Sequence, residues 1–189
     1  SEGDGGFNGS IAHLYLNIIP GSGRVFMDTF PLTKMDTQFS TRYAKDIACE
    51  YLNVDCNNHD FIYTIKANSP IIGGPSAGAA IAILTIATLS DIPINETIAI
   101  TGTINSGGVI GPVGGVELKL EAAAQIGIKT VLISKGSEIA KLDQREHLFV
   151  IEKLNNTTRA KYVTNKSDTI NLTEYGSSLG IDVIGVSDL

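Results

Sequence analysis

The sequence has few of the residues that usually bind metal ions. Its 189 residues include only three histidines and two cysteines, and these are scattered along the chain. Metal sites in proteins normally draw their ligands from short, regular spacings of such residues. His13 and His59 need no special role. We therefore expect no metal and no other cofactor in this chain.

Basic residues and long apolar runs are also scarce. The chain has 14 Lys and Arg residues against 20 Asp and Glu residues, giving a net charge of −6 at pH 7. Nucleic-acid-binding proteins normally carry a basic face, so the charge argues against a nucleic-acid partner. Residues 67–90 carry no charge, but their apolar part, residues 77–89, is too short to span a bilayer. We expect a buried core helix there and no membrane span in this chain.

The recognised nucleotide-binding glycine motifs are absent. The glycine-rich segment 102–115 lies between a strand pattern and a helix pattern, where such a loop can bind phosphate. However, its glycines do not follow the Gly-x-Gly-x-x-Gly spacing, and Gly-x-x-x-x-Gly-Lys-Ser/Thr occurs nowhere in the chain. Nucleotide binding is therefore the weaker interpretation of this loop.

The most informative segment is Gly73-Gly74-Pro75-Ser76-Ala77-Gly78, just before the apolar run. Glycines allow backbone paths closed to other residues, and proline suits the first turn of a helix. Ser76 would then lie at a helix N-terminus, where unpaired N–H groups stabilise an oxyanion. The candidate donors are the backbone N–H groups around Ser76, with Gly74 and Ala77 as the named positions. The alternative is that Ser76 is only a helix cap.

A lysine on an apolar helix face is the second candidate. The pattern of residues 116–126 predicts a helix in which Lys119 shares a face with Ala122, Ala123 and Ile126. Burial favours the neutral form of a lysine and lowers its pKa, and a neutral amine can act as a general base. The alternative is that the Lys119 methylenes pack while the ammonium group reaches water.

The remaining patterns predict alternating strands and helices. Residues 12–18 and 24–29 read as a hairpin, and 36–51 as a helix that Asp36 caps. In that helix an apolar stripe would face a sheet while charged residues face water. The stripe is Phe39, Tyr43, Ile47 and Tyr51, and the charged residues are Arg42, Lys45 and Glu50. Further strands are expected at residues 61–66, 97–101, 129–134 and 181–184, and further helices at 137–145 and 173–179, with a loop at 155–167. The predicted fold class is α/β (α+β), a mixed sheet packed against helices.

The evidence on cellular compartment is divided. Cys49 and Cys56 could form a disulfide or remain free thiols. Six Asn-x-Ser/Thr sites would accept glycans only in an exported protein, and they begin at Asn8, Asn95, Asn155, Asn156, Asn165 and Asn171. Cytoplasmic and exported locations both remain open.

One alternative enzyme class can be weighed directly. Gly74-x-Ser76-x-Gly78 matches the nucleophile elbow of α/β-hydrolases, which needs an acid and then a histidine later in the chain. His147 is the only histidine after Ser76, and Asp143 would have to be its acid, only four residues away. The chain is also short for that fold, so this interpretation is the weaker one.

Several segments together resemble the proteolytic domain of Lon proteases. They are Gly74-Pro75-Ser76-Ala77-Gly78, Thr101-Gly102, the segment from Gly114 to Ala123, and the segment from Gly127 to Ile133. The resemblance implies a Ser-Lys dyad, with Ser76 as nucleophile, Lys119 as base and Thr101 as the hydroxyl that orients the lysine. It also implies the α/β fold of that domain, polypeptide substrates, a homo-oligomeric ring and no metal.

The chain departs from that family at several positions. Gly73 stands where many Lon domains have an acidic residue, Ile62 and Thr64 replace histidines, and Thr103 replaces a glutamate of bacterial relatives. These differences spare the dyad but affect substrate preference and regulation. The ATPase module of a full Lon is absent from these residues, so ATP would matter only through a module outside them. We expect residues 1–189 to be a single proteolytic domain of the archaeal Lon-like type, excised from a longer chain. The alternative is a non-catalytic Lon-like module for peptide binding or ring assembly.

Overall fold

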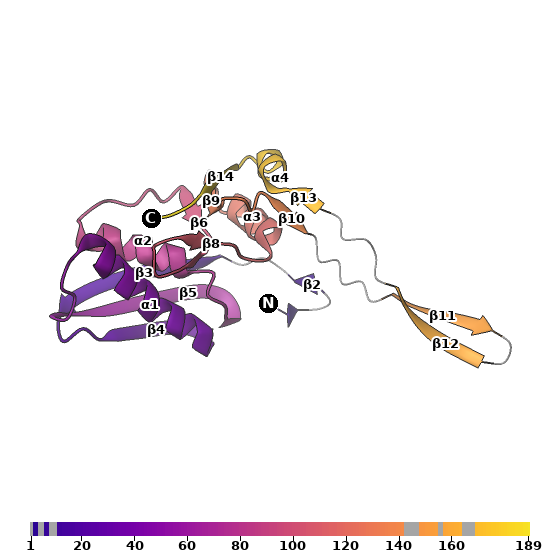
Figure 1. Cartoon of the computed structure of the whole chain (residues 1–189), viewed down its shortest axis with the longest axis horizontal. Helices are drawn as coiled ribbons and strands as arrows, with labels where there is room; N and C mark the ends of the chain where they lie inside the picture. Colours follow the sequence, from indigo (N-terminus) through magenta and orange to yellow (C-terminus); the bar gives the residue numbers. More distant parts are fainter. Residues whose placement is uncertain (1, 4–5, 8–10, 142–147, 155–156, 164–168) are drawn as a thin grey trace.

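The structure is a computed structural model that describes residues 2–3, 6–7, 11–141, 148–154, 157–163 and 169–189. Its helices are α1 (Met35–Leu52), α2 (Gly78–Leu89), α3 (Val116–Gln125) and α4 (Leu172–Ser178). Its strands are β1 (Glu2–Gly3), β2 (Gly6–Phe7), β3 (Ala12–Pro20), β4 (Val25–Thr33), β5 (His59–Ile72), β6 (Ile98–Ile100), β7 (Thr103–Ile104), β8 (Ile110–Gly111), β9 (Thr130–Ser134), β10 (Ile139–Lys141), β11 (Leu148–Leu154), β12 (Thr157–Val163), β13 (Thr169–Asn171) and β14 (Asp182–Val186). Figure 1 shows helices layered on small sheets, which confirms the predicted mixed α/β class.

The first sheet has the strand order β3-β5-β4. β5 lies between the other two, antiparallel to β3 and parallel to β4. The predicted hairpin of β3 with β4 is therefore wrong, although both strands exist. The reason is a later segment of the chain, β5, which is inserted between them and takes the hydrogen bonds that a hairpin would have made.

The start of β5 is fixed in this position by Asp60. Its buried carboxylate accepts hydrogen bonds from the backbone N–H groups of Ser22 and Arg24, at 2.8 and 2.9 Å. It also pairs with the Arg24 guanidinium at 2.7 Å. These bonds, led by that of the Arg24 side chain, lower the pKa of Asp60 from 3.8 to about 2. The turn between β3 and β4 therefore wraps around a carboxylate supplied by β5.

Helices α1 and α2 cover one face of this sheet. Their shared core contains Ala44 from α1, Phe61 and Tyr63 from β5, and Ile81 and Ala82 from α2. The small side chains of Ala44 and Ala82 are fully buried, which allows the two helices to pack closely.

The orientation predicted for α1 is correct only in part: Ile47 is buried and Arg42 and Glu50 are exposed as expected, but the other residues differ. Phe39 and Tyr51 are 64% and 58% exposed, whereas Lys45, expected in water, is buried with its Nζ atom 5.4 Å from the centre of the Phe61 ring. A hydrophobic stripe identifies the buried face of a helix only if no other face of that helix packs more closely against a neighbouring element. Here the face with the small side chains is buried instead, because α2 packs against it.

The second sheet carries the other half of the core. It has the parallel strand order β14-β9-β6. Its core contains Leu120 of α3, Ile133 of β9, Leu172 of α4 and Val183 of β14, which are buried in one cluster. The described residues thus form two separate three-stranded sheets and four strand pairs, where the sequence suggested one sheet.

Two predictions in the C-terminal region are wrong where the structure describes them. Part of the expected helix 137–145 is β10, which pairs with β13, and the rest of it lies outside the described residues. Part of the expected loop 155–167 is β12, which pairs with β11 in a hairpin that lies away from the layered sheets (Figure 1). Pairing with a distant strand overrode the local sequence preference in the first case. The predicted helix at 173–179 and the strand at 181–184 are confirmed as α4 and β14.

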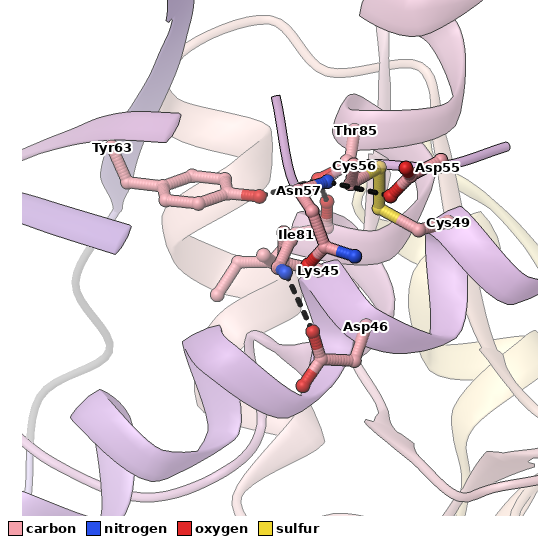
Figure 2. The surroundings of a disulfide bond; sticks show 9 residues. All are labelled: Lys45, Asp46, Cys49, Asp55, Cys56, Asn57, Tyr63, Ile81 and Thr85. Atoms are coloured by element: carbon pink, nitrogen blue, oxygen red, sulfur yellow. Dashed lines mark hydrogen bonds and ion pairs between the residues drawn. A yellow bond between two sulfur atoms is a disulfide. The ribbon is translucent and has the colours of Figure 1, made fainter. Parts of the chain in front are cut away.

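A disulfide joins Cys49, near the end of α1, to Cys56, in the turn before β5 (Figure 2). Both cysteines are 7% exposed and lie in the core beneath α1 and α2. Nearby, the Tyr63 hydroxyl lies 2.7 Å from the Thr85 hydroxyl of α2. The cross-link therefore connects the end of α1 to the turn that leads into β5, the central strand of its sheet.

Candidate active site

The serine turn, residues 73–77, lies between the end of β5 and the start of α2. Gly74 adopts φ +96°, a conformation that strongly favours glycine. Ser76 follows Pro75 and is half-buried two residues before Gly78, the first residue of α2. The expected place at a helix N-terminus is confirmed. Residue Ala77 caps α2 without any side-chain hydrogen bond, so Ser76 is not the cap.

The backbone N–H groups of this turn have different partners. Among the described residues, the N–H groups of Ser76 and Ala77 make no hydrogen bond, whereas that of Gly78 donates to the Pro75 carbonyl at 3.0 Å. The Gly74 N–H donates to the carboxylate of Asp36 at 2.9 Å. Of the two named oxyanion candidates, Ala77 therefore has an uncommitted donor and Gly74 does not.

Lys119 lies on α3, half-buried. Its Nζ atom donates a hydrogen bond to the Thr101 hydroxyl at 3.0 Å. Burial lowers the pKa of Lys119, and the nearby charge of Glu117 acts in the opposite direction. Ala122 and Ala123 are buried as expected, whereas Ile126, at the end of the helix, is 51% exposed. The lysine is thus held inside the site by a defined acceptor, and its side chain does not simply extend into solvent.

The short segment Thr101-Gly102, after β6, connects the lysine to the serine turn. The Gly102 N–H donates to the carbonyl of Ser76 at 3.0 Å, and its own carbonyl accepts from the Ala79 N–H at 3.1 Å. A side chain at Gly102 would collide with Ile110, because its Cβ would lie 2.6 Å from the Ile110 Cγ2 atom. One segment therefore contacts both candidate residues, through the Thr101 side chain and the Gly102 backbone.

A groove opens beside the serine turn. It has a volume of about 500 Å³, and its lining is mostly apolar. The lining residues are Asp36, Phe39, Ser40, Tyr43, Pro75 and Ile104. Because Pro75 directly precedes Ser76, the groove lies next to the candidate nucleophile. The exposed aromatic residues of α1, misassigned from the sequence to the sheet side, contribute its wall.

Sequence analysis missed the role of the first turn of α1. Asp36 was expected to cap this helix, but the cap position is Lys34, and Asp36 lies in the first turn. Its carboxylate bonds to the Thr37 N–H and to the Gly74 N–H, 38 positions further along the chain. An acidic residue near a helix start is common, so no local signal could have identified this long-range contact.

The described residues give no support to the other candidate sites. His147 and Asp143, which the α/β-hydrolase interpretation requires, lie outside the described residues. Within the part of the chain that is described, no three His, Cys, Asp or Glu residues gather as a metal site would require. The described helices also include none with the length and apolar character needed to cross a bilayer.

Comparison with known proteins identifies the family. The model of the Lon protease (S16) C-terminal proteolytic domain matches residues 48–163. The chain is 37% identical to the archaeal Lon protease of Methanothermobacter thermautotrophicus over 84 residues, which are 44% of this chain and 13% of that protein. It is 40% identical to Lon protease 2 of Bacillus subtilis over 92 residues, which are 47% of this chain and 17% of that protein. It is 32% identical to the Lon protease of Paraburkholderia phytofirmans over 130 residues, which are 66% of this chain and 16% of that protein.

The matched region is only a small part of each of these relatives, between 13% and 17% of their length. The family model, in contrast, covers more than half of this chain and includes Ser76, Thr101 and Lys119. The chain therefore belongs to the family of Lon protease (S16) C-terminal proteolytic domains.

Proposed function

We propose that this chain is a serine endopeptidase domain that hydrolyses peptide bonds of unfolded proteins or peptides through Ser76 and Lys119. The observation that carries the proposal is the hydrogen bond from Lys119 Nζ to Thr101 Oγ1, at 3.0 Å, beside a residue that binds the Ser76 carbonyl. A buried lysine with a lowered pKa is more readily neutral, and only the neutral amine can accept a proton.

The first half of the reaction forms an ester with the enzyme. Neutral Lys119 takes the proton of the Ser76 hydroxyl as the serine oxygen attacks the carbonyl carbon of the substrate. The carbonyl oxygen gains negative charge, and the N–H groups of Ser76 and Ala77, which have no partner among the described residues, are the donors that we propose for it. Lys119 then gives its extra proton to the leaving amine, and the carbon–nitrogen bond breaks.

The second half releases the product. Lys119, neutral again, removes a proton from a water molecule that attacks the ester, and the returning proton restores the Ser76 hydroxyl. Thr101 orients the lysine amine throughout, by accepting one of its hydrogen bonds. No step of the proposal calls for a metal or another cofactor in this chain, and ATP would enter only if an ATPase module lies outside it.

The binding partner in this proposal is an extended polypeptide. The groove lined by Phe39, Tyr43, Pro75 and Ile104 offers an apolar surface next to the nucleophile, suited to the apolar side chains that an unfolded protein exposes. Assembly into a homo-oligomeric ring remains part of the proposal, because membership of the Lon proteolytic-domain family implies it.

A labelling experiment tests the nucleophile without depending on a protein substrate. A serine-directed acylating probe should modify Ser76, identified by peptide mass spectrometry, and Ser76→Ala should abolish both labelling and cleavage of an unfolded protein. Ser90→Ala is a matched control, because Ser90 is an exposed serine at the other end of α2. Folded protein with no modification at Ser76 would count against this function and favour a non-catalytic module.

A second pair of variants tests the base. Lys119→Arg should abolish turnover, because a guanidinium group remains protonated near neutral pH. Lys129→Arg makes the same change at an exposed lysine and should leave turnover unchanged. Full activity in folded Lys119→Arg would exclude the dyad.

A further inference from the structure

The first turn of α1 holds both polar backbone groups of Gly74. The Asp36 Oδ2 atom accepts the Gly74 N–H at 2.9 Å, and the Thr37 hydroxyl donates to the Gly74 carbonyl at 3.3 Å. The second oxygen of Asp36 accepts the Thr37 N–H at 2.8 Å. Two neighbouring residues of one helix thus hold the residue two positions before Ser76.

Gly74 has little else to fix its conformation. It has φ +96°, and a Cβ atom placed there would meet nothing within 4 Å. The space on the side-chain side of Gly74 is therefore open, and glycine has the widest choice of backbone conformations of any residue. The hydrogen bonds that Gly74 makes with Asp36 and Thr37 are the contacts that can restrict its conformation.

The restraint at Gly74 reaches Ser76 through Pro75. The proline ring fixes its own φ angle, so one fewer backbone rotation separates Gly74 from Ser76. On the far side, the Gly102 N–H holds the Ser76 carbonyl at 3.0 Å. The serine turn is thus held before and after its nucleophile, by α1 and by the segment that also carries Thr101.

The helix that supplies these contacts is itself well anchored. Thr37 is 1% exposed, and the buried Thr41 hydroxyl donates to the Thr37 carbonyl at 2.8 Å. Near the other end of α1, Cys49 is bonded to Cys56. A rigid support of this kind is what a precisely oriented catalytic group needs.

We propose that Asp36 and Thr37 are positioning residues that orient the Gly74 peptide and so align Ser76 and the N–H groups of Ser76 and Ala77 for attack. This role rests on the proposed peptidase function. It also gives Gly74 a different task from oxyanion binding, since its N–H group is turned towards Asp36. Neither Asp36 nor Thr37 takes part in the bond changes themselves.

Substitutions at Asp36 separate positioning from stability. Asp36 is exposed, and surface substitutions usually change the free energy of unfolding by no more than about 0.5 kcal/mol. Asp36→Ala removes both acceptors. Asp36→Asn keeps one carbonyl oxygen but places an amide N–H group opposite a backbone N–H, so it cannot satisfy both contacts. Glu50→Gln is the matched control, because Glu50 is an exposed acid at the other end of the same helix.

Substitutions at Thr37 test the other contact. Thr37→Val removes the hydroxyl and keeps the side-chain shape, whereas Thr37→Ser keeps the hydroxyl and should restore the bond to the Gly74 carbonyl. Because Thr37 is buried, each variant is compared at a temperature where its unfolding curve shows fully folded protein. Rescue by serine but not by valine assigns the effect to the hydrogen bond.

The measurements are the rate of probe acylation at Ser76 and the separate kcat and KM for a peptide substrate. We expect Asp36→Ala, Asp36→Asn and Thr37→Val to lower kcat and the acylation rate by about 10- to 100-fold, the range expected for misplacement of a reacting group. The pH at which activity reaches half its maximum should stay unchanged in all three variants, because Lys119 is untouched. Thr37→Val should also leave KM unchanged, because Thr37 does not line the groove, whereas Asp36 does. Glu50→Gln and Thr37→Ser should resemble the wild type.

Two results would overturn this assignment in distinguishable ways. If wild-type Ser76 is acylated and the folded Asp36 and Thr37 variants react at the same rate, the positioning role is wrong while the peptidase function stands. If folded wild-type protein is not acylated at Ser76 at all, the nucleophile is wrong and the positioning role is lost with it.

Discussion

Breaking the Cys49–Cys56 disulfide should destabilise the half of the protein that supports the serine turn. The bond closes a loop between residues seven positions apart, from near the end of α1 to the turn before β5. It joins the helix that contacts Gly74 to the turn that leads into the central strand of the first sheet. Reduction leaves both sulfur atoms in the core and removes only the covalent link.

The expected magnitude follows from the length of the closed loop. A cross-link stabilises mainly by lowering the entropy of the unfolded chain, and for a loop this short the chain-entropy relation gives about 2.5 kcal/mol at 25 °C. For a domain of this size, each kcal/mol corresponds to a shift of about 2–4 °C in the unfolding midpoint. Reduction should therefore lower the midpoint by roughly 5–10 °C.

Thermal and urea unfolding of oxidised and reduced protein, followed by circular dichroism, measure this difference. A Cys49→Ala/Cys56→Ala double variant serves as the control, because its midpoint should not respond to the reductant. Thiol titration in denaturant without reductant should find no free cysteine in the oxidised wild type. Two free thiols, or equal midpoints before and after reduction, would refute the reasoning.

Three further predictions concern the site and the first sheet. Activity should rise with pH, and the apparent pKa of this rise should lie below the 10.5 of an ordinary lysine, because burial lowers the pKa of Lys119. A pH-rate profile without such a rise would contradict the assignment of Lys119 as the base. Thr101→Val should lower kcat by roughly 2- to 13-fold, the rate equivalent of losing a hydrogen bond of about 0.5–1.5 kcal/mol, and an unchanged kcat would remove the orienting role. The pKa of Asp60 is lower in the folded state, so the stability it provides is complete above pH 3.8 and is lost as the pH falls to about 2. Asp60→Asn should therefore unfold with a weaker pH dependence over that interval, measured by urea midpoints, and identical slopes for both proteins would disprove the role of the Arg24 pair.

Local sequence patterns predicted the elements around the site with good accuracy. The apolar run after Gly78 is α2, and the helix carrying Lys119 runs from Val116 to Gln125. These predictions succeeded because helix periodicity, glycine and proline act over a few residues. The same local chemistry singled out Ser76, since a serine between glycines before a helix is unusual in a sequence with few other nucleophile motifs.

Predictions failed where distant segments compete for the same surface. The buried face of α1 depends on close packing against α2, so Phe39, Tyr43 and Tyr51 of its apolar stripe were assigned to the wrong side. The hairpin of β3 and β4 failed for the same reason, because β5 inserts between the two strands. A periodicity describes one element, and it contains no information about which neighbour will cover it.

The sequence by itself determined most of the elements around the site and singled out Ser76 and Lys119, because a glycine-rich turn and helix periodicity act over a few residues, whereas Thr101 was identified only through the resemblance to Lon proteolytic domains. Only the tertiary structure decided how they are connected, through the bond from Lys119 to Thr101 and the bond from Gly102 to the Ser76 carbonyl. It alone revealed that Asp36 holds the Gly74 N–H. Hydrogen bonds between residues far apart in the chain form only once the core has brought their elements together, and no local pattern records them.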